Sequence, residues 1–137
     1  MTAYAITDNA VAVPAGSKAY LAQAILDFST TNLAAADTID VIKVPANTIV
    51  LCAGIEVITA GSNAGTIDMG DATAPDTWVT DIAQNATGQE TGSAAKYYSA
   101  ADTLDLLGVT ADMDGKIRVF AVMVPAGPVD PAAAAFA

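Results

Sequence analysis

Apolar and polar side chains alternate along residues 20–28, and this alternation predicts a β-strand. Five even positions are apolar: Tyr20, Ala22, Ala24, Leu26 and Phe28. Gln23 and Asp27 lie among the odd positions of the same segment. A helix would also accommodate these residues, but the segment runs directly into the polar stretch at residues 29–32, so we prefer a strand.

Residues 38–44 and 48–60 are rich in Ile and Val, which favour strands, and Pro45-Ala46-Asn47 between them predicts the turn of a hairpin. In the second strand, alternate residues form an apolar row that we expect to face the core: Ile49, Leu51, Ala53, Ile55 and Val57. The opposite face would hold Thr48, Glu56 and Cys52. Gly54 inside this strand indicates a bulge or a close backbone approach.

Further along the chain, residues 61–65 form a Gly-containing turn that leads into a strand at 66–69, and we expect this strand to pair antiparallel with its predecessor. Strands at 103–109 and 116–124 flank the segment Asp112–Gly115, where an Asp-Gly pair predicts a tight hairpin. Residues 70–101 contain several glycines and a proline, which interrupt regular structure, around the apolar residues Trp78, Val79 and Ile82. We therefore expect a long functional loop or a loop with a short helix.

These segments predict an all-β protein, an antiparallel β-sandwich of about six strands with a jelly roll as the first choice. We expect residues 1–19 to form an extended N-terminal arm and residues 20–124 to form the sandwich domain. Residues 125–137 contain three prolines and are expected to form an irregular C-terminal tail. A chain of 137 residues has the usual size of one domain.

Charge changes the picture of possible partners. Five basic residues stand against fifteen acidic ones, a net charge of -10, which disfavours nucleic acid and anionic membranes as partners. No apolar run is long enough for a spanning helix, and the first residues lack a signal-peptide pattern, so we expect a soluble, unprocessed chain. Only 15% of residues are charged, against about 25% in ordinary soluble domains, so other subunits are expected to cover apolar surface.

The residue types that most enzymes need are missing. The chain has no histidine and one cysteine, Cys52, which its apolar surroundings predict to be a small buried hydrophobe. These counts exclude a Ser-His or Cys-His nucleophile and a structural zinc site, and no phosphate-binding loop motif occurs. We therefore expect no catalytic residues, no cofactor and no metal.

The acidic residues suggest two kinds of site, a glycosidase site and a calcium site. A glycosidase needs two carboxylates, and four cluster in sequence: Asp68, Asp71, Asp76 and Asp81. Aspartates at turns and strand ends explain them equally well, and this interpretation is favoured. Asp112–Gly115 resembles the start of a calcium loop, but Met123 stands where the bidentate Glu belongs. A hairpin turn is therefore favoured, and an adventitious oxygen-ligand site stays open.

Aromatic side chains offer one alternative function. Trp78, Tyr97 and Tyr98 could form a stacking platform for a sugar, although we favour their anchoring the long loop onto the core. A platform of this kind would suit a protein that binds a glycan or a receptor.

Five segments resemble the small decoration or cement proteins of tailed bacteriophages, particularly those of aquatic and cyanobacterial hosts. They are residues 40–50 (DVIKVPANTIV), 54–59 (GIEVIT), 66–71 (TIDMGD), 101–106 (ADTLDL) and 115–124 (GKIRVFAVMV). The resemblance covers about residues 38–124 and consists of strand and turn patterns. Such patterns also occur in other virion proteins, so the alternative is a different virion surface module, associated with a tail, a fibre or a head-fibre base, that binds a host glycan or receptor.

This resemblance implies a jelly-roll homotrimer seated on the exterior of a capsid whose shell is a separate phage major capsid protein. Such a protein would be assembled in the host cytoplasm, and it would stabilise the head against internal DNA pressure. The resemblance supplies no binding residues. From the sequence itself, we expect contacts through the apolar residues of the arm and the last strand: Tyr4, Ile6, Val11, Val13, Phe120, Val122 and Val124.

Overall fold

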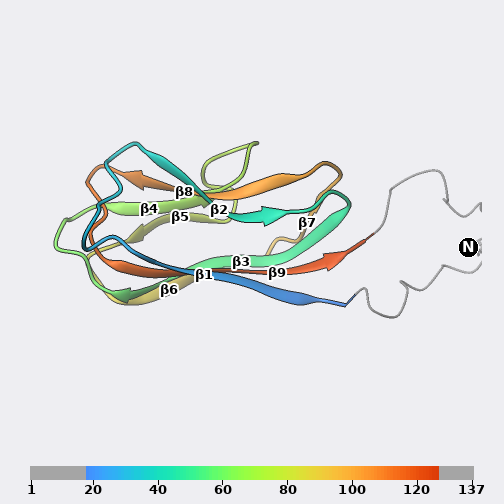
Figure 1. The fold of residues 1–137 in the computed structure, drawn as a ribbon, viewed down its shortest axis with the longest axis horizontal. Helices are drawn as coiled ribbons and strands as arrows, with labels where there is room; N and C mark the ends of the chain where they lie inside the picture. Colours follow the sequence, from blue (N-terminus) through green and yellow to red (C-terminus); the bar gives the residue numbers. More distant parts are fainter. Residues whose placement is uncertain (1–17, 127–137) are drawn as a thin grey trace, which may run out of the picture.

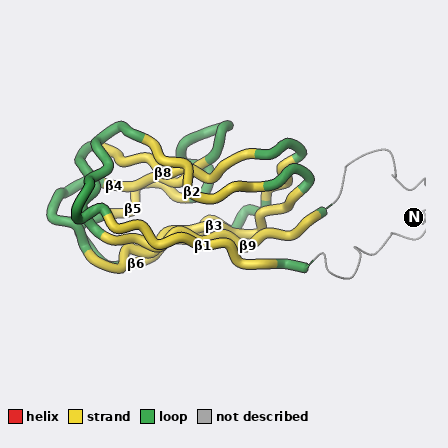
Figure 2. Tube along the Cα trace, in the orientation of Figure 1, coloured by secondary structure: helices red, strands yellow, loops and turns green. Residues whose placement is uncertain are grey.

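The computed structural model describes residues 18–126, which form nine β-strands and contain no helix (Figure 2). The strands are β1 (Tyr20–Asp27), β2 (Thr38–Val44), β3 (Thr48–Thr59), β4 (Thr66–Gly70), β5 (Val79–Ala83), β6 (Gly88–Gly92), β7 (Lys96–Tyr98), β8 (Asp102–Val109) and β9 (Lys116–Pro125). Within this part of the chain, no helix could cross a membrane.

Two antiparallel sheets lie face to face (Figure 1). One has five strands in the order β1-β9-β3-β6, with β7 pairing beside β6 on β3, and the other has four in the order β2-β8-β4-β5. The paired strands are nested along the sequence. β1 pairs with β9, β2 with β8, β3 with β6 and β7, and β4 with β5. This nesting is the topology of a jelly roll and confirms the all-β sandwich predicted from the sequence.

The core lies between the sheets because alternate residues of each strand turn inward. In β9 the odd positions Ile117, Val119, Ala121 and Met123 are all buried, and they meet Leu104 and Leu106 of β8 among the core residues. β1 behaves as predicted, with Ala22 and Leu26 packed against this core. Tyr20, which belongs to the same set of apolar even positions, is exposed at the start of the strand.

The predicted hairpins are wrong. β2 and β3 lie in different sheets, and so do β3 and β4, and β8 and β9, so the turns that join them cross from one layer to the other. Asn47 adopts a positive φ of 57° in the first of these crossings. Turn residues permit the reversal but do not decide which sheet the chain enters. Among the described strands, only β4 and β5 are consecutive partners.

Residues 70–101 are more regular than predicted. They contain three short strands, β5, β6 and β7, and no helix. β6 and β7 both pair with β3, so this segment completes the edge of the larger sheet. The prediction missed these strands because they are only three to five residues long and β6 reads Gly-Gln-Glu-Thr-Gly, without apolar alternation.

Three of the five residues predicted to form the core row of β3 lie in the core. Ala53, Ile55 and Val57 are buried as expected, but the register shifts between Val50 and Cys52, so that Val50 turns inward and Leu51 is exposed. Ile49 therefore does not belong to the core row either. An extra residue at a bulge reverses the alternation beyond it, which period-two reasoning cannot detect.

Gln84 joins the crossings at the end of the sandwich opposite the described termini. Its buried side chain donates to Asp112 O at 2.7 Å, and its backbone carbonyl accepts from Gly61 N at 2.8 Å. Asp114 Oδ1 accepts from Ser62 N at 2.9 Å. The Asp112–Gly115 segment is thus a bonded crossing between sheets.

Candidate functional site

The strands of the two sheets differ in charge. The strands of the five-stranded sheet carry three acidic and three basic residues: Asp27, Glu56, Glu90, Lys96, Lys116 and Arg118. The strands of the four-stranded sheet carry five aspartates and one lysine: Asp40, Asp68, Asp81, Asp102, Asp105 and Lys43. One sheet is therefore neutral and the other strongly acidic.

The neutral sheet presents an apolar outward surface, called here the apolar face. It comprises Leu21, Ile25, Ile49, Leu51, Cys52, Phe120, Val122 and Val124. Leu21, Val122 and Cys52 lie opposite one another on β1, β9 and β3, so these side chains form one row across three strands. Leu21 is 57% exposed, Ile25 56% and Leu51 41%. Exposed large aliphatic side chains gathered on one sheet indicate a contact surface.

Phe120 lies at the centre of the apolar face, above Gly54. The two residues are cross-strand partners, and a Cβ added to Gly54 would lie 2.7 Å from Phe120 Cζ and 2.5 Å from Glu90 O. The absence of a side chain at Gly54 leaves room for the ring of Phe120, as glycine does for aromatic residues in sheets. The close approach predicted at Gly54 is confirmed, whereas the bulge lies at Leu51.

The charged residues beside the apolar face on β1, β3 and β9 pair with one another. Arg118 Nε lies 3.0 Å from Glu56 Oε2, and Arg118 Nη1 donates to Gln23 Oε1 at 3.3 Å. Lys116 Nζ lies 3.7 Å from Asp27 Oδ2. Because these ion pairs cancel locally, a partner that covers this face needs no compensating charge.

The outward surface of the other sheet is called here the acidic face: Asp40, Asp68, Asp81 and Asp105. Asp40 and Asp105 are directly opposite on β2 and β8. Burial raises the pKa of Asp105, and the neighbouring carboxylates of Asp40 and Asp102 raise it further. Asp105 Oδ1 is a buried atom without a hydrogen-bond partner. Burial also raises the pKa of Asp68, despite a hydrogen bond from Asp81 N at 2.7 Å.

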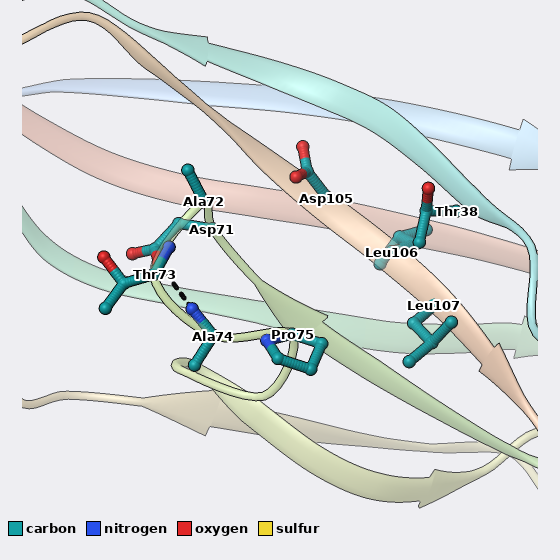
Figure 3. Close-up of a pocket in the computed structure, with 9 residues that line it drawn as sticks. All are labelled: Thr38, Asp71, Ala72, Thr73, Ala74, Pro75, Asp105, Leu106 and Leu107. Atoms are coloured by element: carbon teal, nitrogen blue, oxygen red, sulfur yellow. Dashed lines mark hydrogen bonds between the residues drawn. The ribbon is translucent and has the colours of Figure 1, made fainter.

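A cavity of about 190 Å³ lies on this side, between β8 and the loop after β4 (Figure 3). It is lined by Thr38, Asp71, Ala72, Thr73, Ala74, Pro75, Asp105, Leu106 and Leu107. Two carboxyls border it, but in Figure 3 those of Asp71 and Asp105 point in different directions. The cavity thus lacks the facing pair of carboxyls that glycoside hydrolysis requires.

Asp71 uses its carboxylate to anchor the loop that follows β4. Lys96 Nζ lies 2.6 Å from Oδ2, Tyr98 OH donates to Oδ2 at 2.5 Å, and Thr73 N donates to Oδ1 at 2.9 Å. Burial alone would raise the pKa of Asp71, but the hydrogen bonds from Lys96 and Tyr98 outweigh burial and lower it to about 2. The side chain is fully buried and remains ionised, so its role is structural.

Trp78 completes this anchor. Its Nε1 donates to Tyr98 OH at 3.1 Å, and both aromatic residues are 5% exposed. Their burial confirms the predicted anchoring of the loop. A sugar-stacking platform that includes Trp78 and Tyr98 is wrong, because a ligand cannot reach the faces of buried rings.

The structure places some predicted contact residues and not others. Phe120, Val122 and Val124 lie on the outward side of β9 and are half-buried. Tyr4, Ile6, Val11 and Val13 lie outside the described residues, as does the predicted arm up to residue 17 and the tail from residue 127 onward.

Sequence reasoning missed the most exposed part of the apolar face. The odd positions of β1 were interpreted from Gln23 and Asp27 alone, although Leu21 and Ile25 alternate with them. Cys52 lies opposite the core row, as predicted, but it is half-buried on this outward surface and not buried as its apolar neighbours had predicted. The available signal was a strand with apolar residues on both of its faces, which indicates a covered outer surface.

Residues 18–126 contain no group of three or more His, Cys, Asp or Glu side chains placed to hold a metal ion. Asp112 Oδ1 accepts a hydrogen bond from Ala35 N at 2.9 Å, and Asp114 Oδ2 accepts one from Ser62 Oγ. Both carboxylates of the calcium-like motif are therefore used to hold neighbouring loops.

Comparison with solved structures finds the same fold in chains of three phage capsid structures. A chain in the acid-stable capsid of Helicobacter pylori bacteriophage KHP30 is 13% identical, with a TM-score of 0.59 over 87% of this chain and 92% of that one. A chain of the cyanophage Pam1 capsid is 16% identical, with a TM-score of 0.59 over 86% and 94%. A chain of the Ralstonia phage GP4 capsid is 14% identical, with a TM-score of 0.61 over 87% and 92%.

No family model matches the sequence, and no curated protein matches it. At these identities the likeness establishes the shared fold.

Proposed function

We propose that this chain is a structural protein of a phage virion, a decoration or cement protein that binds the exterior of the head and stabilises it. The observation that carries the proposal is the likeness to chains of three phage capsid structures, each matched over more than 90% of its length. Because the match is nearly complete in both directions, those chains are single sandwiches of similar size.

The protein would act mechanically and without catalysis. As a homotrimer, it would contact several subunits of the major capsid protein at once, and many weak contacts would add because each one raises the effective concentration of the next. The contacts would oppose the outward pressure of packaged DNA. This proposal places the chain on the capsid exterior after assembly in the host cytoplasm.

The contacts with the capsid and with other copies would come from two parts of the chain. We assign Phe120, Val122 and Val124 to contacts of the sandwich. We assign Tyr4, Ile6, Val11 and Val13 to the arm, together with residues 1–19 as a segment that binds a partner. The chain would thus comprise arm, sandwich (20–124) and tail (125–137).

Adding the purified protein to expanded, empty heads of the parent phage tests this function. Binding should saturate at a fixed number of copies per head and raise the temperature at which the heads break. Heads that sediment without bound protein, and that break at an unchanged temperature, would contradict the proposal. Heat-denatured protein at the same concentration provides the control for nonspecific adhesion.

A further inference from the structure

The charge difference between the sheets restricts how two copies of this chain can approach each other. The whole chain has a net charge of -10, so copies repel one another at long range. The four-stranded sheet adds to this repulsion because its strands hold five aspartates and one lysine. The five-stranded sheet is neutral and its charges on β1, β3 and β9 are paired, so it is the side on which close approach is least opposed.

The same neutral side exposes the large apolar side chains. Within the described residues, the exposed large hydrophobic residues are Tyr20, Leu21, Ile25 and Leu51, and all belong to β1 or β3 of the five-stranded sheet. Between them lie Val122 and Cys52, both half-buried. Charge and hydrophobicity therefore select the same surface independently.

We infer that the apolar face is the surface through which copies of this chain associate, with the acidic face turned away from the neighbouring copy. This inference deepens the proposed function, and rests on it for the expectation of three copies. In a threefold assembly the interface is heterologous, so the β1 half of the face meets a different part of the next copy. Leu21 and Ile25 of one copy would then cover Leu51 and Cys52 of its neighbour.

The dependence of association on salt distinguishes this interface from one formed by opposite charges. Association between copies that repel at long range, through a neutral apolar surface, becomes stronger when salt screens the repulsion. A cationic partner that binds the acidic face would instead be released by salt. We therefore expect the apparent mass of the protein to rise, at a fixed protein concentration, between low and physiological ionic strength.

The test compares two double variants with the same change in charge. Leu21→Lys with Ile25→Lys alters the β1 half of the apolar face, and Thr38→Lys with Thr80→Lys alters exposed strand positions of the other sheet. All four positions are exposed, so both variants should fold, which far-ultraviolet circular dichroism and the melting temperature will check. We expect association to weaken about 100-fold in the first variant, as for central interface residues, and to persist in the second.

Sedimentation velocity provides the readout. The wild-type chain and the Thr38→Lys/Thr80→Lys control should sediment as an oligomer, and the Leu21→Lys/Ile25→Lys variant as a 13.7 kDa monomer. A wild-type chain that stays monomeric at every ionic strength overturns the inference, as does a folded Leu21→Lys/Ile25→Lys variant that keeps the oligomer.

Cys52 supplies a second, independent readout, because it is the only cysteine of the chain and lies within the apolar face. In the oligomer its thiol should react with iodoacetamide at least about 10-fold more slowly than in the Leu21→Lys/Ile25→Lys monomer, since a buried thiol is inert. Equal rates in the two proteins contradict the inference.

Failure of this inference and failure of the proposed function can be told apart. A wild-type oligomer with protected Cys52 that does not bind phage heads supports the interface and refutes the decoration role. A monomer that nevertheless binds heads and stabilises them supports the decoration role and refutes the interface.

Discussion

At the residue scale, the cavity beside β8 shows how two carboxyls in one place can have opposite environments. Asp71 accepts hydrogen bonds from Lys96 and Tyr98, which hold its charge inside the fold. Asp105 faces Asp40 across the sheet and has one oxygen without a partner. The ionised carboxylate of Asp71 therefore stabilises the folded state, whereas the ionised carboxylate of Asp105 destabilises it.

We predict that Asp71→Asn destabilises the protein by about 2 kcal/mol at pH 7. The folded pKa of about 2 lies below the ordinary value of 3.8, so the stabilisation is fully present above pH 3.8 and is lost as the pH falls through the folded pKa. Urea unfolding at pH 7, 4 and 2 measures the difference between the two proteins. An equal difference at pH 7 and pH 2 would contradict the ionic role of Asp71.

Asp105→Asn should have the opposite effect and stabilise the protein at pH 7 by about 0.5–1 kcal/mol, the size of a repulsive cross-strand pair. Because the folded pKa of Asp105 is raised, the ionised carboxyl opposes folding above that pKa and has no such effect below 3.8. The gain should therefore shrink as the pH approaches 3. Asp37→Asn, at an exposed loop position, is the control and should leave the unfolding midpoint unchanged.

At the element scale, the strands were more predictable than their connections. Alternation of apolar and polar residues located β1 and β8, and a high content of Ile and Val located β2 and β3. The turns at Asn47 and Asp112–Gly115 were recognised, but their chemistry is the same for a hairpin and for a crossing between sheets. Pairing depends on contacts that are distant in the sequence, such as β1 with β9, and these leave no local signal.

A substitution at Gly54 tests how closely β3 packs between β6 and β9. Gly54→Ala should destabilise the protein by about 1–3 kcal/mol, because the new Cβ would overlap Glu90 O and the Phe120 ring. Gly88→Ala in β6 is the matched control: its Cβ would meet no heavy atom within 4 Å, so stability should stay equal or rise slightly. Thermal unfolding of both variants decides the point. Similar losses in both would mean that general strand flexibility, and not the approach of Phe120, explains Gly54.

At the scale of the whole molecule, the sequence indicated an association surface but located only part of it. The low content of charged residues implied covered apolar surface, and Phe120, Val122 and Val124 lie on the apolar face as half-buried residues. The partition of charge between the sheets was not predictable, because it depends on which strands share a sheet. Leu21, Leu51 and Cys52 became one surface only when β1, β9 and β3 were placed side by side.

A cryo-electron microscopy map of the virion of the parent phage tests the central claim most directly. The account predicts the jelly roll on the outside of the head, in groups of three, with the apolar faces turned toward neighbouring copies and the acidic faces toward solvent. A map that places the chain inside the head, in the tail or a fibre, or nowhere in the particle would contradict it.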